Sequence, residues 1–201
     1  MNKLVPVFLC LGLTACGGSN DDSNSTVTPP PLVPPSLKAD VCYQMSTSMG
    51  NITLAIDLTN VPVTGNNFID YVESDFYNGT LFHRSVNNFV VQGGGYTSGL
   101  VAKLGNAPIV NEANIGLSNK RGTIAMARTS APDSATSQFF INILDNPQLD
   151  ASSSNHGYAV FGEVTSGMEV VDQISVVSTN SSDVPLTEIL ISSVTKTNCS
   201  N

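Results

Sequence analysis

The chain has 201 residues and a formal net charge of −8 at pH 7, with only 8 Lys and Arg residues. So acidic a chain, with so few cations, argues against binding to nucleic acid or to anionic lipid surfaces. Without residues 1–37, which are interpreted below as a signal peptide and a tether, about 165 residues remain. This length suits one domain with one sizeable core.

Residues 1–15 have the features of a secretory signal peptide. Lys3 gives a positive start, and the apolar run 4–13 is too short to span a bilayer. The run ends in Leu13-Thr14-Ala15-Cys16, which resembles a bacterial lipobox, so cleavage before Cys16 and acylation of its thiol are expected. The alternative is an ordinary signal peptide in which Cys16 is incidental.

Residues 16–37 are interpreted as the lipidated cysteine and a tether. The segment is rich in Asp, Asn and Ser and then in Pro, which predicts an extended linker without a core. Acyl chains anchor a protein without a transmembrane helix. The expected location is the periplasmic face of a bacterial envelope membrane. Gly17 stands where lipoproteins of the inner membrane tend to carry Asp, which favours the outer membrane.

The remaining domain, residues 38–201, is predicted to be mainly β. Period-two alternation and turn residues predict strands at 41–47, 52–57, 80–86, 89–92, 122–127, 138–143, 158–163 and 188–194. Helical spacing of apolar residues predicts helices at 63–73 and 168–174, and a long loop is expected at 96–120. This pattern favours a closed antiparallel barrel, although periodicity alone leaves a sandwich nearly as acceptable.

Several kinds of site are excluded by spacing. His83 and His156 do not lie at metal-ligand spacing, and two distant cysteines cannot form a zinc cluster. The glycine run 93–95 fits neither dinucleotide- nor phosphate-binding loops, so it is interpreted as the end of a strand. No Gly-x-Ser-x-Gly elbow indicates a hydrolase. No metal or cofactor is therefore expected.

Three segments carry the informative motifs. They read FHRSVNNFVVQGGG at 82–95, GTIAMAR at 122–128 with SQFFIN at 137–142, and LD at 149–150 with YAVFGEV at 158–164. Together they resemble the cyclophilin family, its bacterial periplasmic members most of all, over about residues 49–174. The resemblance implies an eight-stranded closed antiparallel barrel capped by two α-helices, and peptidyl-prolyl cis/trans isomerase activity without a cofactor.

Proline isomerisation breaks no bond, so its catalyst needs no nucleophile. The planar X–Pro amide resists rotation with a barrier of about 18–20 kcal/mol. A fixed, charged donor aimed at the proline nitrogen would stabilise the twisted amide selectively. The resemblance assigns this role to Arg84, whose guanidinium is always charged; the alternative is a surface arginine at a strand end. Gln92 and Gln138 match positions that hold Arg84 and the substrate backbone by hydrogen bonds.

The other matched positions form a proline pocket and a track for the substrate chain. The resemblance assigns the apolar pocket to Phe89, Val90, Phe140 and Leu149, each of which could otherwise be ordinary core. It places Ala127 and Arg128 along the substrate backbone and Tyr158 at the pocket rim.

Some positions depart from the family. Val90 replaces a common Met, and Arg128 replaces a common Asn. Gln148 stands where eukaryotic members have Trp, which predicts weak cyclosporin binding but retained catalysis. Residues 178–186 match the family poorly and are interpreted as a variable loop.

Cys42 and Cys199 stand near the two ends of the domain. In an oxidising periplasm such a pair can form a disulfide, with two free thiols as the alternative. The family's first and last strands are neighbours, which supports the pairing. The bond would stabilise the fold by at most about 5 kcal/mol, because it would close a very long loop.

The leading hypothesis is a monomeric enzyme that acts on proline-containing polypeptides during the folding of envelope proteins. A tethered binding module for such segments, with little turnover, is the alternative. A structural lipoprotein that only borrows the barrel would explain none of the site residues.

Overall fold

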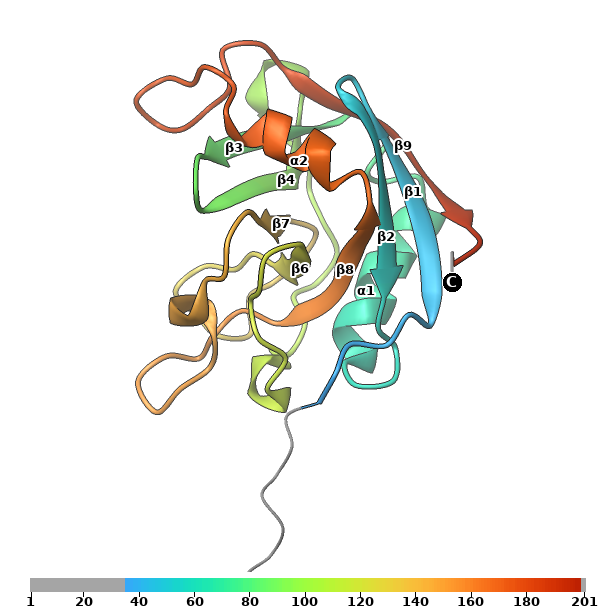
Figure 1. The fold of residues 1–201 in the computed structure, drawn as a ribbon, viewed down its shortest axis with the longest axis vertical. Helices are drawn as coiled ribbons and strands as arrows, with labels where there is room; N and C mark the ends of the chain where they lie inside the picture. The colour runs from blue at the N-terminus through green and yellow to red at the C-terminus, as the bar shows by residue number, and fades with distance from the viewer. Residues whose placement is uncertain (1–34, 200–201) are drawn as a thin grey trace, which may run out of the picture. The chain divides into compact units, whose positions relative to one another are not determined.

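The computed structural model describes residues 35–199 (Figure 1). The predicted signal peptide, Cys16 and most of the predicted tether lie outside the described residues. Within this range no helix is long and apolar enough to cross a lipid bilayer.

The secondary structure consists of strands with two α-helices. The strands are β1 (Val41–Thr47), β2 (Gly50–Ile56), β3 (Thr80–Val86), β4 (Val90–Thr97), β5 (Val101–Ala102), β6 (Thr123–Met126), β7 (Phe139–Asn142), β8 (Val160–Ser166) and β9 (Ile189–Thr197). The helices are α1 (Pro62–Glu73) and α2 (Met168–Ser175), and single 3-10 turns occur at Ser98–Leu100, Ala113–Ile115 and Pro147–Leu149.

The strands form a closed antiparallel barrel. Their order is β3-β9-β1-β2-β8-β6-β7-β4, and the additional pairing of β3 with β4 closes the ring of eight strands. The two-residue strand β5 extends the edge of β4. Figure 1 shows α1 and α2 on different sides of this barrel. The predicted mainly β fold with eight barrel strands and two helices is confirmed, and the sandwich is not adopted.

Strand β4 is longer than predicted. The glycine run was expected to end it at residue 92, but β4 continues to Thr97. Gly94 has a φ of 82°, and a Cβ there would lie 2.8 Å from the Tyr77 ring and 2.9 Å from the Phe139 ring. Glycine inside a strand can mark close packing of this kind as well as the end of a strand. The predicted end at residue 92 was therefore wrong.

Other boundaries differ by a few residues. Strand β8 begins at Val160 rather than at 158, and β9 extends to Thr197 rather than to 194. The expected loop 96–120 contains the short strand β5 and two 3-10 turns. Terminal residues of an element contribute few apolar contacts, so periodicity locates them poorly.

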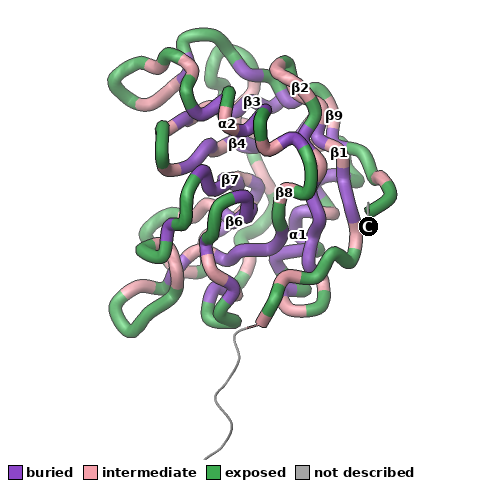
Figure 2. Tube along the Cα trace, in the orientation of Figure 1, coloured by how far each residue is buried: buried purple, intermediate pink, exposed green. Residues whose placement is uncertain are grey.

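Aromatic rings form a large part of the buried core. Phe68 of α1 is fully buried, and its ring centroid lies 5.2 Å from that of Tyr77 and 5.3 Å from that of Phe161. Figure 2 shows burial along the strands and exposure on the connecting loops. Burying such side chains is the main stabilising contribution to the fold.

The first turn of helix α1 is stabilised by a proline and by a carboxylate from another segment. Pro62 occupies the first turn, where its missing N–H costs no hydrogen bond. The carboxylate of Glu112 accepts hydrogen bonds from the Thr64 backbone N–H and hydroxyl, both at 2.7 Å. These contacts satisfy donors that a helix start leaves free, and they orient Phe68 toward the core.

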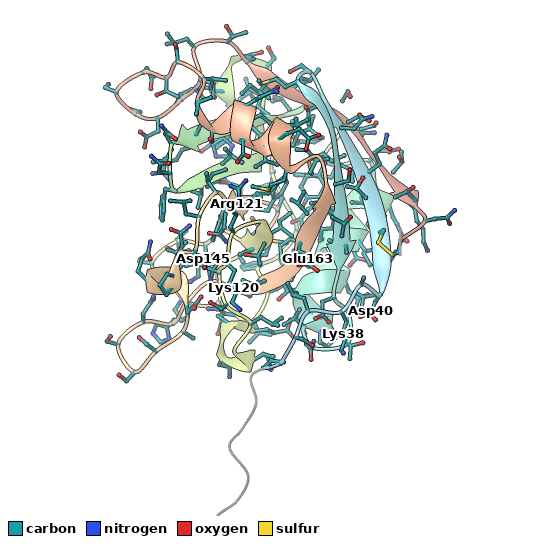
Figure 3. All side chains as sticks on the ribbon, in the orientation of Figure 1. Lys38, Asp40, Lys120, Arg121, Asp145 and Glu163 are labelled. Carbon is teal, nitrogen blue, oxygen red and sulfur yellow. A yellow bond between two sulfur atoms is a disulfide. The ribbon has the colours of Figure 1, made fainter. Side chains whose placement is uncertain are left out.

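The first and last strands lie side by side. β1 pairs antiparallel with β9, and Cys42 faces Thr197 in that register. Cys42 and Cys199 are joined by a disulfide with a Cα–Cα distance of 5.1 Å (Figure 3). This is the pair named from the sequence, and the bond links residues separated by 157 positions.

Candidate active site

A concave pocket of about 120 Å³ opens over β3, β4 and β7, beside the segment that follows β6. It is lined by Arg84, Phe89, Val90, Gln92, Ala127, Arg128, Phe140, Leu149 and Tyr158. The remaining predicted site residue, Gln138, lines an adjacent hollow that shares Gln92, Ala127 and Arg128 with the first. The structure thus brings the predicted site residues together from three strands and from the segments that connect β3 to β4, β6 to β7 and β7 to β8.

Register explains how distant residues meet. Arg84 of β3 pairs with Gln92 of β4, Gln92 pairs with Phe140 of β7, and Phe140 pairs with Ala125 of β6. Directly opposed residues on neighbouring strands lie on the same face of a sheet. One row across the sheet therefore places a cationic, an amide and an aromatic side chain next to each other.

Arg84 is half-buried, with 38 % of its side chain exposed. Its Nη2 donates a hydrogen bond to Oδ2 of Asp183 at 3.2 Å. Among residues 35–199 the guanidinium makes no hydrogen bond to Gln92. Instead Gln92 Nε2 donates to Gln138 Oε1 at 2.9 Å. The side chain that contacts Arg84 is thus not the glutamine implied by the resemblance.

The glycine run also makes room for the hydrogen-bonded pair Gln92 and Gln138. A Cβ at residue 95 would collide with the side chain of Gln138. Gly95 therefore leaves the space in which Gln138 reaches Gln92. This explains why β4 carries glycine beside the pocket without making it a phosphate-binding loop.

The apolar wall is more deeply buried. Val90 and Phe140 are 3 % and 4 % exposed, whereas Phe89 and Leu149 are half-buried. The edges of these side chains reach the pocket while their bodies pack in the core. A ring that entered this pocket would replace water against apolar surface, which is favourable.

Tyr158 and Arg128 form a stacked rim. The Tyr158 ring packs edge-on against Phe140, with centroids 5.6 Å apart and planes at 78°. The Arg128 guanidinium carbon lies 4.5 Å from the Tyr158 ring centre, and Arg128 Nε donates to the Gly157 carbonyl at 2.8 Å. A cation over an aromatic ring is attracted by the ring quadrupole. The contacts hold both side chains in place at the rim.

Buried amides support the pocket from behind. Asn146 Nδ2 donates to the Phe89 carbonyl at 3.1 Å and to Asn142 Oδ1 at 2.8 Å. The Leu149 backbone N–H donates to the Asn146 carbonyl at 2.9 Å. Asn146 therefore connects two residues of the apolar wall. Sequence reasoning missed this role, although asparagines at 142 and 146 in and after a predicted strand were a visible signal.

His83, next to Arg84, does not line this pocket. It lines a separate hollow with Leu100 and Leu186, and its Nδ1 is buried without a hydrogen-bond partner among the described residues. Burial lowers the pKa of its imidazole below the usual value of 6.5, because desolvation disfavours the charged form. The described residues contain no group of three or more His, Cys, Asp or Glu side chains arranged to hold a metal ion.

Two residues that were not predicted to form the site lie close to it. Asp183, in the segment that matched the family poorly, contacts Arg84. Gln148 is exposed, does not line the pocket, and donates from Nε2 to Asn146 Oδ1 at 3.1 Å. Nothing in the local sequence pattern marks Asp183, since the contact spans 99 positions.

Comparisons with known proteins agree on one family. The sequence model described as cyclophilin type peptidyl-prolyl cis-trans isomerase/CLD matches residues 42–196. Peptidyl-prolyl cis-trans isomerase A of Dickeya dadantii is 55 % identical over 153 residues, covering 74 % of this chain and 80 % of that protein. Peptidyl-prolyl cis-trans isomerase B of Escherichia coli is 49 % identical over 156 residues, covering 75 % and 95 %.

A solved structure agrees as well. The cyclophilin type isomerase of Cryptosporidium parvum, crystallised in the presence of the dipeptide Ala-Pro, superposes with a TM-score of 0.70 at 26 % identity. The match covers 79 % of this chain and 99 % of that one.

Proposed function

This chain belongs to the cyclophilin-type peptidyl-prolyl cis-trans isomerases and has their activity, and from this premise we propose that Arg84 and the apolar pocket beside it carry out the reaction on envelope proteins. The single observation that carries the proposal is the convergence of Arg84 with an apolar socket in one pocket. The chemistry requires these two parts and no third reactant.

The socket binds the proline ring and fixes the amide beside Arg84. Val90 and Phe140 supply buried apolar surface, and Phe89 and Leu149 supply its edges. Such burial acts on both planar isomers alike, so it sets affinity rather than the rate of the chemical step.

Arg84 stabilises the twisted amide more than the two planar isomers. When the amide twists, the proline nitrogen recovers its lone pair and becomes a better hydrogen-bond acceptor. The guanidinium stays charged and presents several N–H donors in one plane. Donation to that nitrogen strengthens only in the twisted state, which lowers the barrier. Gln92 and Gln138 bind the substrate backbone in this scheme, alongside the backbone of Ala127 and Arg128.

The experiment follows cis-to-trans conversion of a short X–Pro peptide by the purified full chain, with Arg84→Ala as the comparison. We expect fast conversion by the wild type and loss of most activity in the variant. Binding of the peptide without faster conversion by the wild type would instead support a tethered binding module.

The cellular part of the proposal is folding of envelope proteins by a lipid-anchored chain, with the outer membrane favoured by Gly17. Support comes from the leader, from the lipobox-like segment ending at Cys16, and from the Cys42–Cys199 disulfide, which fits an oxidising compartment. A mass measurement on protein extracted from membranes tests it. Acyl chains would add mass at Cys16, and an unmodified Cys16 within an uncleaved chain would contradict the anchor.

Weak cyclosporin binding and a monomeric state are further parts of the proposal. Gln148 is exposed and bonded to Asn146 rather than forming a flat wall of the pocket. We expect Gln148→Trp to bind cyclosporin more tightly than the wild type, as measured by inhibition of peptide conversion. Equal inhibition of both would contradict the role given to Gln148. The molar mass of the purified protein, measured by light scattering, should be that of one chain.

A further inference from the structure

The loop between α2 and β9 docks on the strand that carries Arg84. The Asp183 carbonyl accepts a hydrogen bond from the Ser85 backbone N–H at 2.8 Å. Its carboxylate Oδ2 accepts one from Arg84 Nη2 at 3.2 Å. One residue of the loop therefore holds two consecutive residues of β3, one through its main chain and one through its side chain.

Asp183 itself is held in a braced turn. Its φ of 62° lies in the left-handed region, which Asn and Asp tolerate better than most residues. Asn180 Oδ1 accepts hydrogen bonds from the backbone N–H groups of Ser182 at 2.9 Å and Val184 at 3.1 Å. The Asp183 backbone N–H donates to the Asn180 carbonyl at 3.1 Å. The carboxylate thus projects from an ordered turn.

The other end of the same connection is fixed to β3 as well. The hydroxyl of Ser85 donates to the carbonyl of Ile174, near the end of α2, at 2.8 Å in a buried position. β9 pairs with β3 only from Thr80 to Phe82. Beyond that point Asp183 takes the place of the partner strand at the edge of β3.

Arg84 needs such a partner. A long side chain that is 38 % exposed loses conformational entropy when it is held in one orientation. Among residues 35–199 no other side chain accepts a hydrogen bond from its guanidinium. The contact to Asp183 uses one of the two terminal nitrogens, which leaves the remaining N–H groups available to a substrate.

We propose that Asp183 is a positioning residue, which holds the Arg84 guanidinium over the proline pocket before the X–Pro amide twists. The inference rests on the proposed function of Arg84. Because Asp183 does not line the pocket, its removal changes the orientation of the donor and leaves the proline socket intact. The effect falls on kcat and spares KM.

The expected loss is moderate. Asp183→Ala lowers kcat by about three- to tenfold, because a misplaced catalytic group loses part of the benefit of orientation. Asp183→Asn retains a carbonyl acceptor and tolerates the left-handed backbone, so it loses less. The exposed ion pair contributes little to stability, so Asp183→Asn unfolds at nearly the wild-type denaturant concentration. Asp183→Ala unfolds at a somewhat lower one, because alanine is disfavoured at a φ of 62°.

The experiment measures kcat, KM and urea unfolding on the full chain, for wild type, Asp183→Ala, Asp183→Asn, Arg84→Ala and the double variant Arg84→Ala/Asp183→Ala. If Asp183 acts through Arg84, its substitution has no further effect once Arg84 is absent. An inactive wild type would refute the proposed function. An active wild type with an unchanged or raised kcat in Asp183→Ala would refute only the positioning role.

Two control variants match the substitution. Asp172→Ala removes another exposed pair, in which Arg121 Nη2 lies 2.8 Å from Asp172 Oδ2 (Arg121 is labelled in Figure 3), and neither residue lines the pocket. Ser182→Ala changes an exposed side chain in the same turn, where only the backbone N–H of Ser182 is used. Both should keep the wild-type kcat. A fall in kcat equal to that of Asp183→Ala in either control would overturn the inference, because it would show a non-specific loss.

Discussion

The two sides of the barrel differ in how regularly their strands pair. On the right of Figure 1, β1 and β2 pair from Val41 with Ile56 to Thr47 with Gly50 without a register shift, and a disulfide ties β1 to the end of the chain. On the left, β3 and β4 pair with two register shifts, and their residues Arg84 and Gln92 are half-buried. We call these the regular and the irregular side after these two pairings alone, since the pairings of β1 with β9 and of β2 with β8 each have one register shift. The regular side contributes stability and the irregular side presents the chemistry, so each should be alterable without the other.

The largest expected effect lies on the regular side. Replacing both Cys42 and Cys199 by serine should lower the free energy of unfolding by up to about 5 kcal/mol, because the unfolded chain is no longer closed into a long loop. Urea unfolding measures this loss. The kcat of the folded variant at 25 °C should stay within about twofold of wild type, since such distant sites act independently.

Reduction of the wild type with a thiol is the control for that pair of substitutions and should reproduce the loss. If the serine variant folded normally but lost its isomerase activity, the separation between the two sides would be wrong.

Asn146 should affect both stability and substrate binding, because it is buried and also supports the pocket. Asn146→Ala should lower the free energy of unfolding by about 1–3 kcal/mol, as its partners Phe89 and Asn142 are left with unpaired polar groups. KM should rise because Phe89 and Leu149 lose a common support. Urea unfolding and peptide conversion measure both effects together.

Gln148→Ala is the matched control, since Gln148 is exposed and contacts the same Asn146 from outside. It should unfold like the wild type. Equal losses in both variants would mean that the buried amides have no special part in supporting the pocket.

The smallest effect concerns His83 and pH. Burial lowers the pKa of His83 in the folded state below 6.5, so below that pH the unfolded chain binds the proton more readily than the folded one. The free energy of unfolding should therefore fall as the pH drops below about 6.5, by less than about 1.4 kcal/mol per pH unit from this one group. Above that pH the contribution is fully present.

Urea unfolding between pH 7.5 and 5 measures the dependence, and His83→Gln should flatten it. His156→Gln, at an exposed histidine, is the control and should keep the wild-type slope. A slope unchanged by His83→Gln would show that another group causes the dependence.

Apolar periodicity predicted the helices and most strands, because it is a local property, whereas the choice of a barrel over a sandwich depended on the resemblance to a family. The site residues came from resemblance, and the structure gathers them in adjoining hollows. The extent of β4 through Gly94 was missed, since only the packed rings of Tyr77 and Phe139 explain that glycine. Asp183 was missed because its contact to Arg84 depends on the docking of a loop 99 positions away.

The most direct test of the catalytic role of Arg84 compares Arg84→Ala and Arg84→Lys with the wild type and measures kcat/KM and the free energy of unfolding on the same samples. Arg84→Ala should lose about 100- to 1,000-fold in kcat/KM, the scale seen when a preorganised donor is removed, and Arg84→Lys should fall in between. The free energy of unfolding should change by less than about 0.5 kcal/mol, as for other substitutions outside a core. Retention of wild-type kcat/KM by a folded Arg84→Ala variant would show that Arg84 does not stabilise the twisted amide.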